Sequence, residues 1–198
     1  MKLCFYLATK NKNKVKEIKN IIGEEIEILL PPSFIDFPEE KGDTLEENAY
    51  LKAEYFSRYI KDNYVVGEDS GLFVDKLNGL PGVISARFSG ERDDKKNIEK
   101  LLDMMKRYKN KEERKAKFIT VVCLIGKGEK KFFKGEIDGY ITFEPKGNNG
   151  FGYDPVFEIP EIGKTFAELS LEEKNRISHR AKAFLKLKEY LIDKEGKR

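Results

Sequence analysis

Acidic residues occur in three adjacent pairs, each at the edge of a predicted helix or strand. The pairs are Glu39 with Glu40, Glu46 with Glu47, and Glu68 with Asp69. Mg²⁺ prefers oxygen ligands and commonly takes one or two carboxylates together with substrate phosphates and water. The second pair also fits the first turn of a helix, where acidic groups cap and complement the helix dipole. For the other two pairs a Mg²⁺ site and a solvated turn remain alternatives.

A group of candidate phosphate ligands follows the first apolar run, residues 3–8. It consists of Thr9, Lys10, Asn11, Lys12, Asn13 and Lys14. A predicted helix over residues 12–22 begins inside this group, and helix N-termini and ammonium groups both attract anions. The segment therefore predicts a triphosphate-binding loop, with an exposed lysine-rich helix face as the alternative.

Segment 148–155 places two aromatic residues and an aspartate among glycines, in the order Asn-Asn-Gly-Phe-Gly-Tyr-Asp-Pro. Glycine lets the backbone approach a ligand, and aromatic rings offer faces on which a base can stack. The segment is a candidate base-binding loop, and a plain surface loop with one buried aromatic is the alternative.

Several other chemistries lack the residues they need. His179 is the single histidine, which excludes a multi-histidine zinc site, and no Gly-x-Ser-x-Gly elbow accompanies it. Cys4 and Cys123 lie in apolar strand-like runs, so we expect buried thiols and no disulfide framework. The P-loop pattern Gly-x-x-x-x-Gly-Lys-Ser/Thr is absent. Phosphate chemistry with oxygen ligands remains.

Length and composition allow one globular domain over residues 1–198, or two small lobes that share a sheet. The chain is 39% hydrophobic and 37% charged, and its formal net charge is only +3. Near-neutral charge gives no sign of a nucleic-acid partner. No apolar run approaches the roughly 18 residues of a membrane span, and the apolar N-terminus is too short for a signal peptide. We therefore predict a cytoplasmic protein with no membrane partner.

The elements that position these residues follow from periodicity and end signals. Helical patterns cover residues 12–22, the segment after the capping box at Thr44, residues 92–108 and residues 178–192. Strand patterns cover residues 3–8, 25–30, 64–67, 71–74, 118–125 and 131–143. Glu68, Asp69 and Ser70 read as a turn between two short strands. Helix-separated strands followed by a hairpin at residues 126–128 predict an α/β fold with a mixed sheet.

Taken together, these segments resemble the inosine/xanthosine triphosphate pyrophosphatase family, also called Ham1-like. The matching stretches lie in family order over nearly the whole chain: residues 7–14 with Glu17, residues 39–42, 47–49, 52–53, 68–72, 74–75, 78–83, 85–87, 150–157, 163–168, 173–175 and 178–180. Two departures are small. Lys10 stands where the family often has glycine, and Glu68 stands where many bacterial members have a second aspartate.

The resemblance implies an elongated mixed β-sheet flanked by helices, with two lobes and a central cleft, and usually a homodimer. It implies hydrolysis of ITP, dITP and XTP at the α-phosphate, giving the nucleoside monophosphate and pyrophosphate and so cleaning the nucleotide pool. Mg²⁺ is the implied cofactor.

The resemblance also assigns roles. Residues 9–14 and Lys52 hold the triphosphate. Glu39 and Asp69 hold Mg²⁺, with Glu40 or Glu68 in support, and Asp69 takes the proton of the attacking water. The base is bound by a set consisting of Ser70, Phe151, Gly152, Tyr153, Asp154, Lys174, His179 and Arg180.

Selectivity is expected to come from a hydrogen-bond donor such as Arg180 or a backbone N–H. Hypoxanthine and xanthine carry a 6-keto oxygen where adenine has an amino group, and a buried donor left unpaired costs about 1–3 kcal/mol. Guanine also has a 6-keto group, so its exclusion needs another element. The rival functions are a nucleic-acid-binding module and a pyrophosphatase for canonical nucleotides.

Overall fold

The computed structural model describes residues 3–196, which fall into two compact units. Unit 1 comprises the residues up to Asp69, Thr120–Gly135 and those from His179 onward. Unit 2 comprises Ser70–Ile119 and Glu136–Ser178. Strands β3 (Tyr64–Val74), β5 (Lys115–Gly126) and β6 (Glu129–Ile141) contribute residues to both units.

Hydrogen-bonded neighbours in the sheet follow the order β2-β1-β3-β5-β6-β7-β8, and β4 pairs with β3. Strand β1 (Cys4–Leu7) runs parallel to both β2 (Glu27–Leu29) and β3, whereas β4 (Pro81–Gly82) runs antiparallel to β3. The expected α/β fold with a mixed sheet is therefore confirmed.

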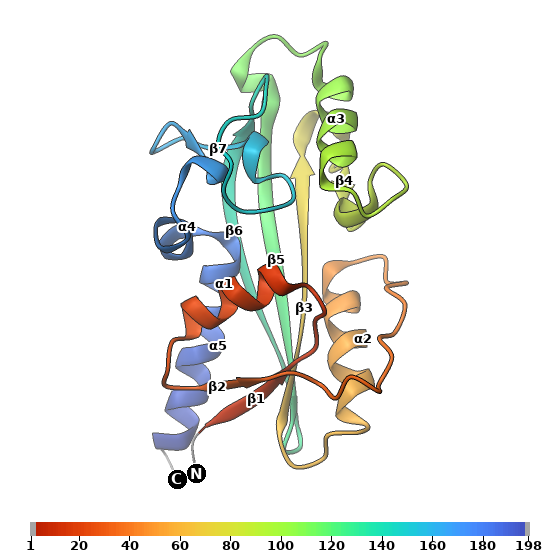
Figure 1. The fold of residues 1–198 in the computed structure, drawn as a ribbon, viewed down its shortest axis with the longest axis vertical. Helices are drawn as coiled ribbons and strands as arrows, with labels where there is room; N and C mark the ends of the chain where they lie inside the picture. Colours follow the sequence, from red (N-terminus) through yellow and green to blue (C-terminus); the bar gives the residue numbers. More distant parts are fainter. Residues whose placement is uncertain (1–2, 197–198) are drawn as a thin grey trace. The chain divides into compact units, whose positions relative to one another are not determined.

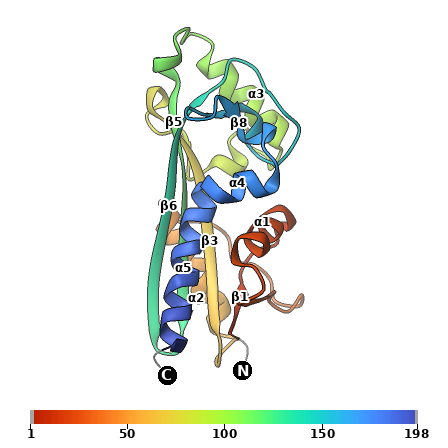
Figure 2. The same ribbon diagram turned by 90° about the vertical axis from the view of Figure 1, so that its left-hand side faces the viewer.

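In unit 1, helices cover both faces of the strands (Figures 1 and 2). Helices α1 (Lys12–Ile22) and α5 (His179–Gly196) lie side by side and share one apolar core with β1, β3 and β5. Helix α2 (Leu45–Ser57) packs on the other face, where Phe56 belongs to one buried apolar cluster with Val65 and Ala8. Residues Val65 and Val66 thus serve opposite faces, as the alternation of side chains along a strand requires.

Capping residues define where these helices begin. Asn11 caps α1, and its side chain accepts from the backbone N–H groups of Asn13 and Lys14. Thr44 and Glu47 form the predicted capping box at the start of α2.

Unit 2 packs its own apolar core between β3, β5, β6 and shorter elements. Its remaining strands are β7 (Phe157–Ile159), antiparallel to β6, and β8 (Lys164–Thr165), antiparallel to β7. Its α-helices are α3 (Asp94–Met105) and α4 (Leu171–Ile177). Five short 3₁₀ helices complete the described chain: η1 (Asp75–Leu77), η2 (Ser85–Arg87), η3 (Lys111–Arg114), η4 (Asp154–Val156) and η5 (Phe166–Glu168).

The predicted turn at Glu68, Asp69 and Ser70 is wrong. Strand β3 is continuous from Tyr64 to Val74, and both acidic side chains are buried within it. Charged groups are tolerated there because cationic side chains from other elements pair with them. Strands β7 and β8 were also missed, since runs of two or three residues are too short to show a period.

Helix and strand boundaries elsewhere shift by a few residues from the predicted ones. Predicted helix 92–108 is α3, Asp94–Met105, and predicted strand 131–143 is β6, Glu129–Ile141. Among residues 3–196, every helix is too short or too polar to span a bilayer.

Candidate active site

The centre of the candidate site is Asp69, whose carboxylate is buried in unit 1 and held from two sides. Its Oδ2 accepts a hydrogen bond from Asn48 Nδ2 at 3.1 Å, and its Oδ1 lies 3.3 Å from Lys52 Nζ. The same Nζ donates to Glu40 Oε1 at 2.8 Å. One ammonium thus links two carboxylates that lie 29 positions apart in the sequence.

Glycine at position 67 allows α2 to supply these contacts. A Cβ at Gly67 would lie 2.0 Å from the carbonyl oxygen of Ala49, so only glycine lets the helix backbone approach β3 this closely. Asn48 and Lys52 stand four positions apart on α2 and therefore face the same direction, toward Asp69. The Asn48 amide is fixed in turn, because its Oδ1 accepts from the backbone N–H of Gly42 at 2.8 Å.

The pKa values of this group reflect burial and neighbouring charge. Burial raises the pKa of Asp69 above its ordinary value, although Lys52 and Lys14 act to lower it. Burial alone would lower the pKa of Lys52, but the negative charges of Asp69 and Glu40 outweigh it and the pKa is raised. A raised pKa makes the Asp69 carboxylate a stronger base than an ordinary aspartate.

A second ion-pair network surrounds Glu68, the neighbour of Asp69 on β3. Its Oε2 lies 2.6 Å from Lys14 Nζ, and its Oε1 accepts from Arg180 Nη2 at 3.1 Å and from Nε at 3.3 Å. Arg180 Nη1 also donates to Glu17 Oε2 at 2.6 Å. Burial would raise the pKa of Glu68, but Lys14 and Arg180 hold it well below its ordinary value. Glu68 is therefore an anion that orders two cations.

The predicted phosphate loop, residues 9–14, leads from β1 into α1. Asn11 Oδ1 accepts from the backbone of Asn13 and Lys14, and Asn11 N–H donates to Thr9 Oγ1 at 3.2 Å. The first turn of α1 is thus closed by its own cap. The ammonium of Lys14 points into unit 1 toward Glu68, while Lys12 is exposed.

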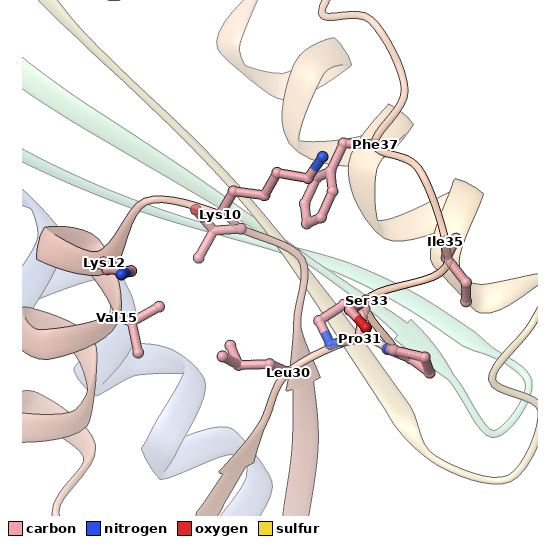
Figure 3. A pocket seen from close by; sticks show the side chains of 10 residues that line it. Lys10, Lys12, Val15, Leu30, Pro31, Ser33, Ile35 and Phe37 are labelled. Carbon is pink, nitrogen blue, oxygen red and sulfur yellow. The ribbon is translucent and has the colours of Figure 1, made fainter.

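A cavity of about 360 Å³ opens beside this loop (Figure 3). The loop contributes Thr9, Lys10 and Lys12, and the opposite wall is the largely apolar segment 30–37. Figure 3 shows Lys10 extended toward Phe37, and its Nζ lies 4.8 Å from the centre of that ring. Neither Asp69 nor Lys52 lines this cavity.

Glu40, rather than Glu39, is the acidic residue that the structure places beside Asp69. The Glu39 side chain is 77% exposed and pairs with Lys41, whereas the Glu40 side chain is 21% exposed and contacts Lys52. Since both bonds share one Nζ, the Glu40 and Asp69 oxygens lie no more than 6.1 Å apart. A Mg²⁺ ion that bound both carboxylates directly would hold their oxygens within about 4.2 Å of each other, and phosphate and water would complete its shell. Within residues 3–196, no cluster of three or more histidine, cysteine or acidic side chains could hold a metal alone.

The remaining predicted residues lie mostly in unit 2, where a buried pair supports the glycine-rich loop. Asp154 Oδ2 accepts from Lys174 Nζ at 2.5 Å and from the backbone N–H of Phe151 at 2.9 Å. A Cβ at Gly150 would lie 2.0 Å from the same oxygen, and its φ of +75° also requires glycine. Lys174 Nζ lies 5.0 Å from the centre of the Phe151 ring.

Tyr153 differs from the expectation of a ring open to a base. It is 5% exposed, belongs to the core of unit 2, and donates its hydroxyl to the carbonyl oxygen of Ser85 at 2.8 Å. Phe151 is the aromatic residue of this segment that is only partly buried. The N–H of Gly152 donates to Asp94 Oδ2 at 2.7 Å.

Ser70 lies in unit 2 on β3 and is partly buried, whereas His179 is buried at the start of α5 in unit 1. Sequence reasoning assigned no role to Glu17 or Asn48, although both hold site residues in place. For Asn48 the signal was its position, one helical turn before Lys52 and directly after a capping box.

Known proteins resemble this chain in sequence and in fold. The model of the Ham1 family matches residues 5–190. A dITP/XTP pyrophosphatase of Caldanaerobacter subterraneus subsp. tengcongensis is 48% identical, with 94% of each chain covered. One of Thermoanaerobacter sp. is 45% identical, with 94% of this chain and 95% of that one covered. The solved structure of the Staphylococcus aureus Ham1 protein has a TM-score of 0.84 and 41% identity, and covers 98% of this chain and 100% of its own. The chain therefore belongs to the Ham1 family.

Proposed function

We propose that this chain hydrolyses non-canonical purine nucleoside triphosphates, namely dITP, ITP and XTP, to the monophosphate and pyrophosphate. The observation that carries the proposal is a buried Asp69 held by Lys52 and Asn48 in a chain 45–48% identical to proteins named dITP/XTP pyrophosphatase. Removal of such nucleotides would prevent their incorporation into DNA and RNA.

Asp69 is the proposed general base. Its buried carboxylate is held in place by Asn48 and Lys52, and it would take a proton from a water attacking the α-phosphorus. The bond between the α-phosphorus and the bridging oxygen then breaks, and pyrophosphate leaves with the electron pair. Lys14 and Lys52 are the proposed cationic groups that balance charge on the transferred and leaving phosphates.

We further propose that the reaction needs Mg²⁺, with Glu40 and Asp69 as its protein ligands. Supporting this choice, both carboxylates contact one ammonium, whereas Glu39 faces solvent and Glu68 is bound by Lys14 and Arg180. The ion would neutralise charge on the triphosphate.

For the base, Phe151 is the proposed stacking surface, with the Asp154–Lys174 pair ordering its loop. A donor facing the 6-keto oxygen would accept hypoxanthine and xanthine and disfavour adenine by about 1–3 kcal/mol. A homodimer and a cytoplasmic location remain predictions, and light scattering on the purified chain would test the first.

The assay measures pyrophosphate released from ITP, dITP, XTP, GTP and ATP, with Mg²⁺ and with EDTA. We expect release from the first three, little from GTP and ATP, and none with EDTA. Orthophosphate in place of pyrophosphate would place the attack at the terminal phosphorus and contradict the mechanism.

The base assignment is tested by Asp69→Asn, with Asp103→Asn on the exposed side of α3 as the matched control. Loss of a general base costs about 10²–10⁴-fold in kcat. We expect a loss of this size for Asp69→Asn at an unchanged circular dichroism spectrum, and none for the control. Near-normal kcat in Asp69→Asn would exclude Asp69 as the base.

A further inference from the structure

Lys52 occupies the position between the two carboxylates that are the proposed metal ligands. Its Nζ lies 2.8 Å from Glu40 Oε1 and 3.3 Å from Asp69 Oδ1, and its side chain is 8% exposed. The second oxygen of Asp69 is bonded to Asn48 Nδ2. In this arrangement the carboxylate pair already has a cation.

A divalent cation that entered between Glu40 and Asp69 would come within a few ångströms of this ammonium. Like charges at such a distance repel strongly in a partly buried site, where water screens them poorly. The ammonium must therefore move away before the ion can bind well. Lysine can do so because its four-carbon stem is flexible and its charge is a compact point that any anion can satisfy.

A polyphosphate is the anion that would attract Lys52 away from the carboxylates. Lys14 extends from the phosphate loop to Glu68, the neighbour of Asp69 on β3. The loop and α2 therefore each contribute one lysine to the same region of unit 1. Phosphates bound by residues 9–14 would thus lie within reach of lysine side chains in this unit.

We propose that Lys52 excludes free divalent cations from the Glu40–Asp69 pair until a polyphosphate takes its ammonium, so that metal and nucleotide bind cooperatively. This inference rests on the proposed function for the identity of the site. By linkage, the factor by which polyphosphate strengthens metal binding equals the factor by which metal strengthens polyphosphate binding.

The experiment measures Mn²⁺ binding in the absence of any phosphate, by calorimetry and by the paramagnetic resonance signal of free Mn²⁺. We compare the wild type, Lys52→Met and the control Lys106→Met, whose ammonium pairs with Asp103 on the exposed surface of α3. Lys52→Met is expected to bind Mn²⁺ at least about tenfold more tightly than the wild type, because the repelling charge is gone. Lys106→Met is expected to match the wild type.

A second measurement adds imidodiphosphate, with the Mn²⁺ concentration corrected for the complex it forms in solution. Imidodiphosphate is expected to raise the Mn²⁺ affinity of the wild type at least about tenfold and to have much less effect on Lys52→Met. Adding Glu40→Gln to Lys52→Met is expected to abolish the gain in Mn²⁺ affinity, which places the gain at this carboxylate pair. If Lys52→Met fails to fold, Lys52→Gln serves the same comparison.

Equal or weaker Mn²⁺ binding in the folded Lys52 variant would overturn the inference, as would the absence of Mn²⁺ binding in every protein. Because no nucleoside triphosphate is used, the result is separate from the proposed activity. Pyrophosphate release with no effect of Lys52 on Mn²⁺ would refute only the cooperative binding. The expected Mn²⁺ result without pyrophosphate release would refute only the proposed reaction.

Discussion

Replacing Arg180 with methionine tests whether its guanidinium is a fixed part of unit 1. Arg180 donates to Glu17 at 2.6 Å and to Glu68 at 3.1 and 3.3 Å, and all three residues are at most 3% exposed. Removing one partner of a buried ion pair costs about 3–5 kcal/mol, since the remaining charges stay out of water. For a chain of this length, each kcal/mol lowers the melting temperature by about 2–4 °C. We therefore expect Arg180→Met to melt about 6–20 °C below the wild type.

The assay is thermal unfolding followed by circular dichroism at pH 7, with Lys106→Met as a control for loss of an exposed lysine pair. That control is expected to cost no more than about 1 kcal/mol. Adding Glu17→Gln to Arg180→Met is expected to restore part of the lost melting temperature, because it removes the charge of one of the two buried carboxylates that no longer have Arg180 as a partner. A melting temperature within about 3 °C of the wild type would refute the reasoning. It would mean that the guanidinium is not held by both carboxylates in solution, and would favour Arg180 as a donor to the base.

Three further outcomes are expected. Glu40→Gln is expected to lower the rate of Mg²⁺-dependent pyrophosphate release at least about tenfold, and Glu39→Gln is expected to lower it much less. A larger loss in Glu39→Gln than in Glu40→Gln would identify Glu39 as the metal ligand. Gly67→Ala is expected to lower the free energy of unfolding by at least about 1–3 kcal/mol and to reduce activity, because its Cβ would clash with the carbonyl oxygen of Ala49. Unfolding in urea measures this loss, and an unchanged midpoint would contradict the close approach of α2 to β3. Burial acts to raise the pKa of Glu129, but hydrogen bonds from a lysine and two tyrosine hydroxyls lower it to about 2. Its stabilisation is therefore complete above about pH 4.5 and is lost as pH falls through about 2. Glu129→Gln is thus expected to be less stable than the wild type by about 1 kcal/mol at pH 7 and by clearly less at pH 2, where about half of the carboxylate is protonated, and a constant difference across this range would exclude the ionised carboxylate as its source.

Helices that are stabilised by interactions among their own residues could be predicted from the sequence. The capping box at Thr44 and Glu47 fixes the start of α2 through hydrogen bonds within four residues. The period of apolar residues placed α1 at its observed bounds for the same reason. Such features need no partner from elsewhere in the chain.

Features that depend on distant partners could not be predicted from the sequence. Glu68 and Asp69 looked like a turn because two adjacent carboxylates in a strand are costly unless cations reach them. Those cations come from α1, α2 and α5, which lie far away in sequence. Tyr153 likewise looked available to a base, and its burial depends on the carbonyl of Ser85, 68 positions earlier.

The sequence also could not predict which of the two adjacent glutamates, Glu39 or Glu40, lies beside Lys52. Glu39 and Glu40 have the same side chain, and which of them meets Lys52 depends on the path of an irregular loop. That path is fixed partly by the bond from the backbone of Gly42 to Asn48, which no periodic pattern reveals.

Two lysines to which the family resemblance assigns phosphate binding are also the counter-ions that allow β3 to carry two buried carboxylates. Lys14 serves Glu68, and Lys52 serves Asp69. Substrate binding at this site would therefore exchange carboxylate–lysine pairs for phosphate–lysine pairs, and only the difference between the two sets would appear as affinity. The metal becomes necessary on this reasoning, because Glu40 and Asp69 lose their cation at the moment when the phosphates gain one. Replacing either lysine would then lower the free energy of unfolding even without a nucleotide, since the buried carboxylates are present whether or not a nucleotide is bound.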